Sequence, residues 1–508
     1  CYQKAVQWAD ESKSQWLAHD LLSREALFFS DIDEQTRTTL SKLKNHQRVL
    51  EGQIAEASDK LVRDSLSKAL FIGQENLEKH LLSLEKNYPK YFHWLVGSPF
   101  PTLTKISEHC KKDEALLLYL HGDSGLVAFA FTDKGPLYFR TPKDLNLDVA
   151  IEEFERSVNG IKTARKDPTR ARNRLLKSGN QLYDYLLAPF GDELFSKSHW
   201  SVIADGSLSG IPFDALFTTS DSPSYSEIPY LVFEHSVSYA INIESWMTPR
   251  AKRASSLSYT GYAPSYSEDQ LSSLQGLDDF PEARRGLKPL TFSLKEVEAG
   301  RALFGGQAYT TDATETRFKA TSEHSSIIHL AMHALLDDEQ PLLSKFVFLE
   351  DTATVDDGLL NLWELFPLYL NADLAILSAC NSGAGVHHKG EGLETLARGF
   401  QHSGIPAVTT SLWQVDDEAG MTIIIPFLQQ LREGQSKSEA LRQAKISYLK
   451  NSGDDLAHPY FWSGLVLIGD NSPLGGQATL PWRLIIGSLL LALSVIIFLR
   501  KRQQKKKA

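Results

Sequence analysis

Two side chains of this sequence, Cys380 and His333, have the type and the position needed for nucleophilic chemistry. Cys380 ends the apolar run ADLAILSAC, and His333 ends the apolar run SSIIHLAMH. Each run predicts a buried strand, and parallel sheets bind ligands outside the carboxyl ends of their strands. Asn381, Ser382 and Gly383 follow the cysteine directly, and such small or polar neighbours argue against a buried structural thiol.

A cysteine and a histidine at neighbouring strand ends can cleave a peptide bond. The imidazole favours the thiolate and later protonates the leaving amine, while backbone N–H groups near the nucleophile hold the developing oxyanion. His333 precedes Cys380 by 47 residues, close to the roughly 50 residues that separate this pair in caspase-type proteases. The spacing therefore favours a cysteine peptidase.

A zinc site is the alternative for the same segment. His329 and His333 are four residues apart, and His387 and His388 follow Cys380, so nitrogen and sulfur ligands for zinc are present. Residues 325–333 have the pattern of a strand, and the cysteine peptidase hypothesis already explains two of these side chains. We expect neither a metal ion nor an organic cofactor.

The composition limits the class of protein. With 508 residues and 42% apolar side chains, the chain can form two to four domains. A formal charge of −10 gives no broad basic field, so we expect no nucleic-acid partner. Cys1, Cys110 and Cys380 lie far apart in the sequence and predict no disulfide scaffold. Because the chain starts with Cys1, we expect a fragment or a processed product.

The periodicity divides the chain into regions. Residues 1–110 have helical periodicity, with Leu43, Leu50 and Ala57 seven residues apart; a packed helical hairpin is favoured over a surface dedicated to a partner. This region can also be the end of a repeat array. The later regions are an α/β half over residues 111–248, a linker over 249–288, and an α/β half over 289–470 with a doubly wound sheet.

The sequence HGDSG at residues 121–125 allows two interpretations. It is superficially similar to the Gly-Asp-Ser-Gly sequence of chymotrypsin-like proteases. Glycine and aspartate also supply hairpin geometry between two alternating strands. We expect the hairpin.

Several motifs of the chain resemble the CHAT family, whose caspase-like peptidase domains belong with caspases and separases and commonly follow tetratricopeptide repeats. The motifs are ATETRFK (313–319), IIHLAMHA (327–334), LAILSACNSGAG (374–385), GEGLETLARGFQHSGIPAV (390–408), SLWQVDD (411–417), SEALRQA (438–444) and HPYFWSGLVLIGD (458–470). A weaker match, IADGSLSGIPFDAL (203–216), resembles the non-catalytic half of the family's paired caspase-like architecture. The resemblance implies a caspase-like doubly wound sheet with a non-catalytic and a catalytic half.

The resemblance also implies roles for individual residues. Cys380 and His333 correspond to the catalytic dyad, and the backbone N–H groups of Ala334 and Cys380 to the oxyanion site. The family commonly has glycine where this chain has Ala334, so a backbone that needs positive φ there would impair catalysis. In separase-like proteases an aspartate four residues after the tryptophan, here Asp417, meets a basic substrate side chain. Asp416 and Asp417 can equally cap the following helix.

The C-terminal segment predicts a membrane anchor. Residues 484–499 are uncharged and follow Trp482 and Arg483, while residues 500–508 are basic. This pattern predicts one transmembrane helix after a stalk over residues 471–483, with interfacial residues compensating for its short length. The basic tail favours a cytoplasmic C-terminus and an extracytoplasmic catalytic domain; insertion as a tail anchor would leave the domain in the cytoplasm.

Together these observations predict a membrane-anchored cysteine endopeptidase of the CHAT type that cleaves proteins after a basic residue. The expected partners are a protein or peptide substrate, the lipid bilayer, and a protein bound to the helical N-terminal region. The alternative is a catalytically inactive caspase-like scaffold for protein interactions at the membrane.

Overall fold

The computed structural model describes most of the chain up to residue 476. The described residues are 2–11, 34–57, 59–87, 100–122, 125–141, 146–204, 206–248, 257–274, 289–335, 337, 343–351, 353–354, 356–366, 368, 370–378, 387–388, 392–393, 396–413 and 415–476. Within them, no helix is both long and apolar enough to cross a membrane. The predicted span over residues 484–499 and the basic tail lie outside these residues, so the anchor stays a prediction.

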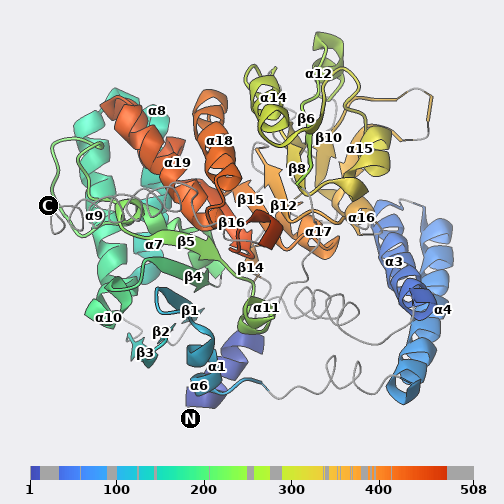
Figure 1. The fold of residues 1–508 in the computed structure, drawn as a ribbon, viewed down its shortest axis with the longest axis horizontal. Helices are drawn as coiled ribbons and strands as arrows, with labels where there is room; N and C mark the ends of the chain where they lie inside the picture. The colour runs from blue at the N-terminus through green and yellow to red at the C-terminus, as the bar shows by residue number, and fades with distance from the viewer. Residues whose placement is uncertain are drawn as a thin grey trace, which may run out of the picture.

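A large mixed sheet forms the centre of the molecule (Figure 1), with its eleven strands in the order β3-β2-β1-β4-β5-β16-β15-β12-β8-β6-β7. A three-stranded sheet, β11-β10-β9, and the pair β13-β14 complete the described strands. The bounds are β1 Glu114–Gly122, β2 Gly125–Thr132, β3 Gly135–Arg140, β4 His199–Ile203, β5 Ser236–Tyr239, β6 Tyr259–Tyr262, β7 Gly306–Tyr309, β8 Ile327–Leu330, β9 Ala334–Leu335, β10 Lys345–Val347, β11 Leu359–Asn361, β12 Leu374–Leu377, β13 His387–His388, β14 Gly392–Leu393, β15 Ala407–Ser411 and β16 Leu465–Gly469.

The strands of the C-terminal part have the order of a doubly wound sheet. In the large sheet, the strands from β6 onward lie side by side in the order β7, β6, β8, β12, β15 and β16. The first five of these run parallel to one another. Only β16 runs antiparallel to its neighbour β15. The strand order reverses between β6 and β8, and open α/β sheets bind ligands at the carboxyl edge near such a point. The mixed α/β architecture predicted from the sequence is confirmed.

Helices cover both faces of this sheet because the strand residues are apolar on both faces. Leu374 and Ile376 belong to the core that includes α18, while Ala375 and Leu377 belong to the core that includes α15, α16 and α17. The helices are α1 Tyr2–Glu11, α3 Glu34–Glu56, α4 Lys60–Asn87, α6 Leu103–His109, α7 Leu147–Asn159, α8 Ile161–Lys166, α9 Pro168–Leu186, α10 Asp192–Phe195, α11 Ile243–Met247, α12 Glu268–Leu274, α14 Ser293–Phe304, α15 Glu315–Thr321, α16 Leu362–Leu365, α17 Leu396–His402, α18 Asp417–Arg432 and α19 Lys437–Asn451. The strands are therefore buried on both sides, as parallel sheets require.

The N-terminal elements include two hairpins that the sequence predicts. Strands β1 and β2 pair antiparallel, with Gly122 opposite Gly125, so the predicted hairpin of two strands is confirmed. Helices α3 and α4 pack against each other as a helical hairpin (Figure 1). Helix α3 also approaches α16 closely, because a Cβ at Gly52 would lie 2.4 Å from the Trp363 ring.

The loop predicted over residues 249–288 is wrong for residues 257–274. This part contains β6, which pairs with β7 and β8, and α12. Tyr259 and Tyr262 supply the buried surface of β6, whereas an aliphatic run, the usual sequence signal for a central strand, is missing. Residues 249–256 and 275–288 lie outside the described residues.

Candidate functional site

The register of two adjacent strands relates the two residues of the predicted dyad. Strands β8 and β12 are parallel neighbours, and Leu330 at the end of β8 lies opposite Leu377 at the end of β12. His333 follows Leu330 by three residues, and Cys380 follows Leu377 by three residues. The structure describes His333 but not Cys380, so the two positions are related here by register and chain length.

His333 is held by its backbone and flanked by an aromatic ring. Its side chain is buried, with 4% exposed. Its N–H donates to the Tyr266 hydroxyl over 3.2 Å, and its carbonyl accepts from the N–H of Val347 over 3.0 Å. The rings of His333 and Tyr266 lie 5.1 Å apart between centroids. The histidine is therefore fixed at the strand end rather than carried on an open loop.

Ala334 begins β9, the edge strand of the three-stranded sheet, and pairs with Phe346 of β10. Because the N–H of Val347 donates to the carbonyl of His333, Ala334 and Phe346 form a non-hydrogen-bonded pair, and the Ala334 N–H points away from β10. Its extended backbone tolerates a Cβ. The departure from glycine therefore causes no backbone strain here.

A buried polar network connects β6, β8 and the end of β12 with α14, and its member Ser378 precedes the predicted nucleophile by two residues. The Tyr259 hydroxyl lies 2.7 Å from His329 Nδ1, and His329 Nε2 lies 2.9 Å from Ser378 Oγ and 3.2 Å from Glu296 Oε2. Ser378 Oγ donates to Glu296 Oε2 over 2.7 Å. Both nitrogens of His329 are thus engaged by protein groups, and the described residues contain no cluster of metal-binding side chains.

Glycines make room for this network. A Cβ at Gly300 of α14 would lie 2.2 Å from the Tyr259 ring, and one at Gly261 of β6 would lie 2.8 Å from the Tyr259 hydroxyl. Both distances are shorter than packed atoms allow. The two glycines therefore let the tyrosine lie between strand and helix and reach His329.

The two aspartates before α18 have different environments. Asp416 is the N-cap, and its Oδ1 accepts from the N–H of Ala419 over 3.1 Å. Asp417 is the first residue of α18, and its Oδ2 accepts from the N–H of Phe292 over 3.0 Å. Burial, followed by the nearby Glu296 carboxylate, raises the pKa of Asp417 despite this hydrogen bond. The capping role thus belongs to Asp416.

A small cavity collects the acidic groups at this edge of the sheet. Among the described residues it is lined by Glu296, Ser378, Ser411, Asp416 and Asp417, together with Leu290, Val415, Gly420 and Leu465. It lies where β12 and β15 end and where α14 and α18 contact each other. Carboxylates from two helices therefore share one cavity beside the segment that leads to Cys380.

The sequence interpretation missed Glu296, Ser378 and Tyr259. Glu296 stands in the helix SLKEVEAGRALF four residues before Gly300 and eight before Phe304, on its buried side. A carboxylate on the buried stripe of an amphipathic helix was the available signal, because burying a charge is costly unless it has a partner.

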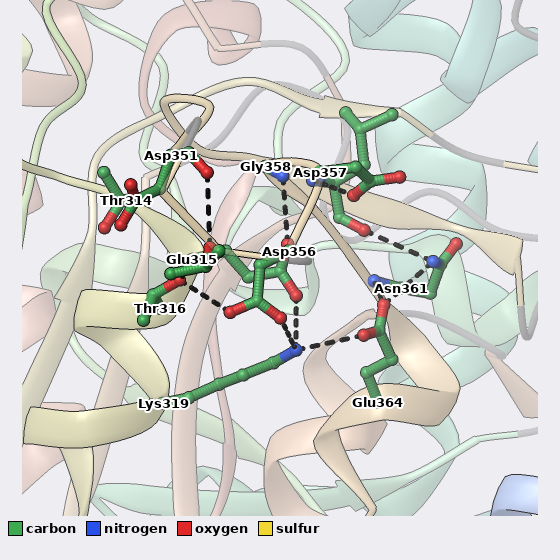
Figure 2. Close-up of polar contacts among 12 residues, drawn as sticks. Thr314, Glu315, Thr316, Lys319, Asp351, Asp356, Asp357, Gly358, Asn361 and Glu364 are labelled. Carbon is green, nitrogen blue, oxygen red and sulfur yellow. Dashed lines mark hydrogen bonds and ion pairs between the residues drawn. The ribbon is translucent and has the colours of Figure 1, made fainter.

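A second polar cluster fixes the three-stranded sheet that carries Ala334. Figure 2 shows Lys319 of α15 surrounded by the carboxylates of Glu315, Asp356 and Glu364, at 2.5, 3.0 and 3.1 Å from Nζ. Glu315 Oε2 also accepts from the N–H of Gly358 over 3.1 Å. Burial raises the pKa of Glu315 to about 7. The cluster ties α15 and α16 to the segment that enters β11.

Cys110 shows what a structural thiol looks like in this fold. It is buried, and its Sγ contacts the carbonyl of Phe131 at 3.3 Å. Burial raises the pKa of the Cys110 thiol to about 12, so little reactive thiolate forms at neutral pH.

A comparison with known protein families finds one match for this chain. The sequence model of the CHAT domain matches residues 176–470, more than half of the chain. No curated protein matches the sequence.

A search of solved structures finds matches at low sequence identity. The Saccharomyces cerevisiae separase–securin complex is 10% identical with a TM-score of 0.47; the match covers 90% of this chain and 39% of the separase chain, so this chain spans about two fifths of that length. The Arg-specific cysteine proteinase gingipain R is 10% identical with a TM-score of 0.35, covering 59% of this chain and 68% of its own. A complex of the pro- and mature domains of Porphyromonas gingivalis RgpB is 11% identical with a TM-score of 0.35, covering 66% and 78%.

Proposed function

The chain belongs to the CHAT domain family, and we propose that it is a cysteine endopeptidase with Cys380 as nucleophile and His333 as its acid–base partner. The observation that carries the proposal is the register of β8 and β12, in which Leu330 lies opposite Leu377. Both proposed residues follow these paired strand ends by three positions. Parallel strands present their carboxyl ends at one edge of the sheet, where chemistry is normally located.

The proposed reaction uses the residues at this edge in sequence. His333 takes the thiol proton of Cys380, and the thiolate attacks the substrate carbonyl carbon. The N–H groups of Ala334 and Cys380 bind the oxyanion, and the orientation of the Ala334 N–H away from β10 supports this role for Ala334. His333 then protonates the leaving amine, and water hydrolyses the acyl-enzyme to regenerate the thiol.

A basic residue before the cleaved bond is the proposed substrate preference. Asp417 lines the acidic cavity while Asp416 caps α18, which leaves Asp417 free of the capping role. Its partly buried carboxylate would gain from a cationic partner, because an uncompensated buried charge is costly. We therefore propose Asp417 for the S1 role, while Asp416, which also lines the cavity, caps α18.

Peptide hydrolysis by point variants tests the activity. Cys380→Ala and His333→Ala should each lower kcat/KM by at least about 1,000-fold, because each removes a member of one catalytic unit. Circular dichroism and thermal unfolding should stay close to wild type for Cys380→Ala. Cys110→Ala is the matched control and should keep activity, since Cys110 is buried in a different core. Unchanged hydrolysis by purified Cys380→Ala would contradict the proposal.

An apolar face on α4 favours a protein-binding role as the second candidate function. Leu61, Phe71, Ile72 and Leu82 are each more than half exposed and fall within about 100° of one another around the helix axis. Such a face suits a protein partner. If the Cys380→Ala protein keeps its cellular effect, this scaffold function replaces the peptidase function.

Attachment to a membrane through residues 484–499, with the catalytic domain outside the cytoplasm, is also part of the proposal. Its support is the apolar sequence and the basic residues that follow it. Membrane fractionation with and without residues 484–508 tests the anchor, and reporter fusions at residue 508 test its orientation.

A further inference from the structure

We propose that Glu296 couples the binding of a cationic substrate side chain to the positioning of the strand end that presents Cys380. This inference rests on the proposed peptidase function and adds a positioning residue that the sequence analysis did not identify.

The carboxylate of Glu296 contacts both the end of β12 and the acidic cavity. Its side chain is buried, with 2% of the residue exposed. Glu296 Oε2 accepts from Ser378 Oγ over 2.7 Å and lies 3.2 Å from His329 Nε2. The same side chain lines the acidic cavity together with Asp417. A ligand in the cavity therefore contacts a group that already holds β12.

Ser378 links the Glu296 carboxylate to the backbone at the end of β12. Its N–H donates to the carbonyl of Leu330 over 3.1 Å, and its hydroxyl is held by Glu296 and His329. Cys380 follows Ser378 by two residues. Fixing both the backbone and the side chain of Ser378 restricts the direction in which the chain leaves the strand.

The charges at the cavity indicate a cation as its ligand. Glu296 and Asp417 line the same cavity, and its described lining residues include no Lys or Arg. Two partly desolvated carboxylates repel each other, and a guanidinium or ammonium group between them removes that cost. The cation would fix Glu296, and through it Ser378, in the arrangement seen here.

A neutral substrate side chain would lack this effect. Glu296 would then keep its contacts to Ser378 and His329, and the repulsion from Asp417 would favour a rotation of the Glu296 carboxylate. We therefore expect basic substrates to gain in kcat as well as in KM, because correct positioning of the nucleophile acts on the chemical step.

Kinetics of matched variants test the coupling. Glu296→Gln should lower kcat at least about tenfold for peptides with Lys or Arg before the cleaved bond and change kcat less than twofold for the matched norleucine peptide. Ser378→Ala should lower kcat for both peptides, and adding Glu296→Gln to it should cause little further loss. Glu298→Gln is the control, since Glu298 lies on the same helix but pairs with Arg301 at the surface; it should behave as wild type.

Alkylation of Cys380 by iodoacetamide provides a readout that needs no peptidase activity. Saturating agmatine, a free guanidinium ligand, should change the alkylation rate of Cys380 severalfold in wild type and in Glu298→Gln, but not in Glu296→Gln. An agmatine effect that persists in Glu296→Gln, or an equal loss of kcat for basic and norleucine peptides in that variant, would overturn the coupling. If wild type hydrolyses no peptide yet shows the agmatine effect, the coupling stands and the peptidase function fails.

Discussion

At the scale of single residues, the neighbouring carboxylates of Asp416 and Asp417 have different structural roles. Asp416 accepts from the N–H of Ala419 and caps α18, whereas Asp417 lies 3.0 Å from the N–H of Phe292 and lines the cavity with Glu296. The sequence DD before a helix cannot separate the two roles, because either residue can act as a cap. The structure separates them through the partner that each carboxylate meets.

Substitution of each aspartate should separate stability from specificity. Asp416→Ala should lower the free energy of unfolding by about 1 kcal/mol through loss of the cap and keep the ratio of kcat/KM for basic and neutral substrates. Asp417→Asn should retain most of the stability and reduce that ratio. Urea unfolding and a peptide library measure the two effects. A basic preference that survives in Asp417→Asn would remove Asp417 from the substrate site.

Part of the site could be predicted from the sequence, and the reasons differ from residue to residue. The strand that ends three residues before His333 follows from its apolar run, and the hairpin of β1 and β2 follows from the glycines of the segment between them. The contacts among Tyr259, Glu296 and Ser378 could not be predicted, because they join three strands and a helix from distant parts of the sequence. Hydrophobic periodicity indicates which face of a helix or strand is buried, but not which other element packs against that face.

At the scale of elements, the three-stranded sheet depends on the cluster around Lys319 (Figure 2). Strand β9 carries Ala334 and pairs with β10, which pairs with β11. Glu364 accepts from the N–H of Asn361 at the end of β11 and also contacts Lys319. The position of the proposed oxyanion N–H is therefore linked to a buried group of charges.

We expect the cluster around Lys319 to make a pH-dependent contribution to the free energy of unfolding. Burial raises the pKa of Glu315 from 4.5 to about 7, so the folded state binds more protons than the unfolded state between these two values. The free energy of unfolding should therefore fall as pH rises from 4.5 to 7, by at most about 1.4 kcal/mol per pH unit from this group. Glu315→Gln should remove this part of the slope.

Urea unfolding at several pH values measures the slope for both proteins. Glu298→Gln, which changes an exposed carboxylate, is the control and should retain the wild-type slope. Identical slopes for wild type and Glu315→Gln would show that Glu315 is ionised throughout this range.

At the scale of the whole molecule, both α/β parts share one sheet. Ile468 of β16 pairs with Tyr239 of β5, which joins the strands of the N-terminal part to those of the C-terminal part. A buried ion pair crosses the same junction, with Lys445 Nζ of α19 2.5 Å from Asp214 Oδ2 in the short 3₁₀ helix η3 (Phe213–Ala215). We therefore expect the two parts to unfold together.

Breaking this ion pair should destabilise the junction strongly. Lys445→Met leaves the Asp214 carboxylate buried without its partner and should cost about 3–5 kcal/mol. The exposed pair of Lys79 and Glu75 on α4 is the control, and Lys79→Met should change stability little. Differential scanning calorimetry should show one transition at a lower temperature for Lys445→Met. A separate low-temperature transition, or no change in Tm, would contradict the shared core.

We propose that Cys380 is an activated nucleophile in a site for basic substrates. A peptidyl acyloxymethyl ketone with a basic residue next to the reactive group tests it, with tandem mass spectrometry locating the adduct. We expect one adduct, at Cys380, that forms much more slowly in His333→Ala and with the norleucine analogue. An unlabelled protein, or an adduct at Cys110 in place of Cys380, would contradict it.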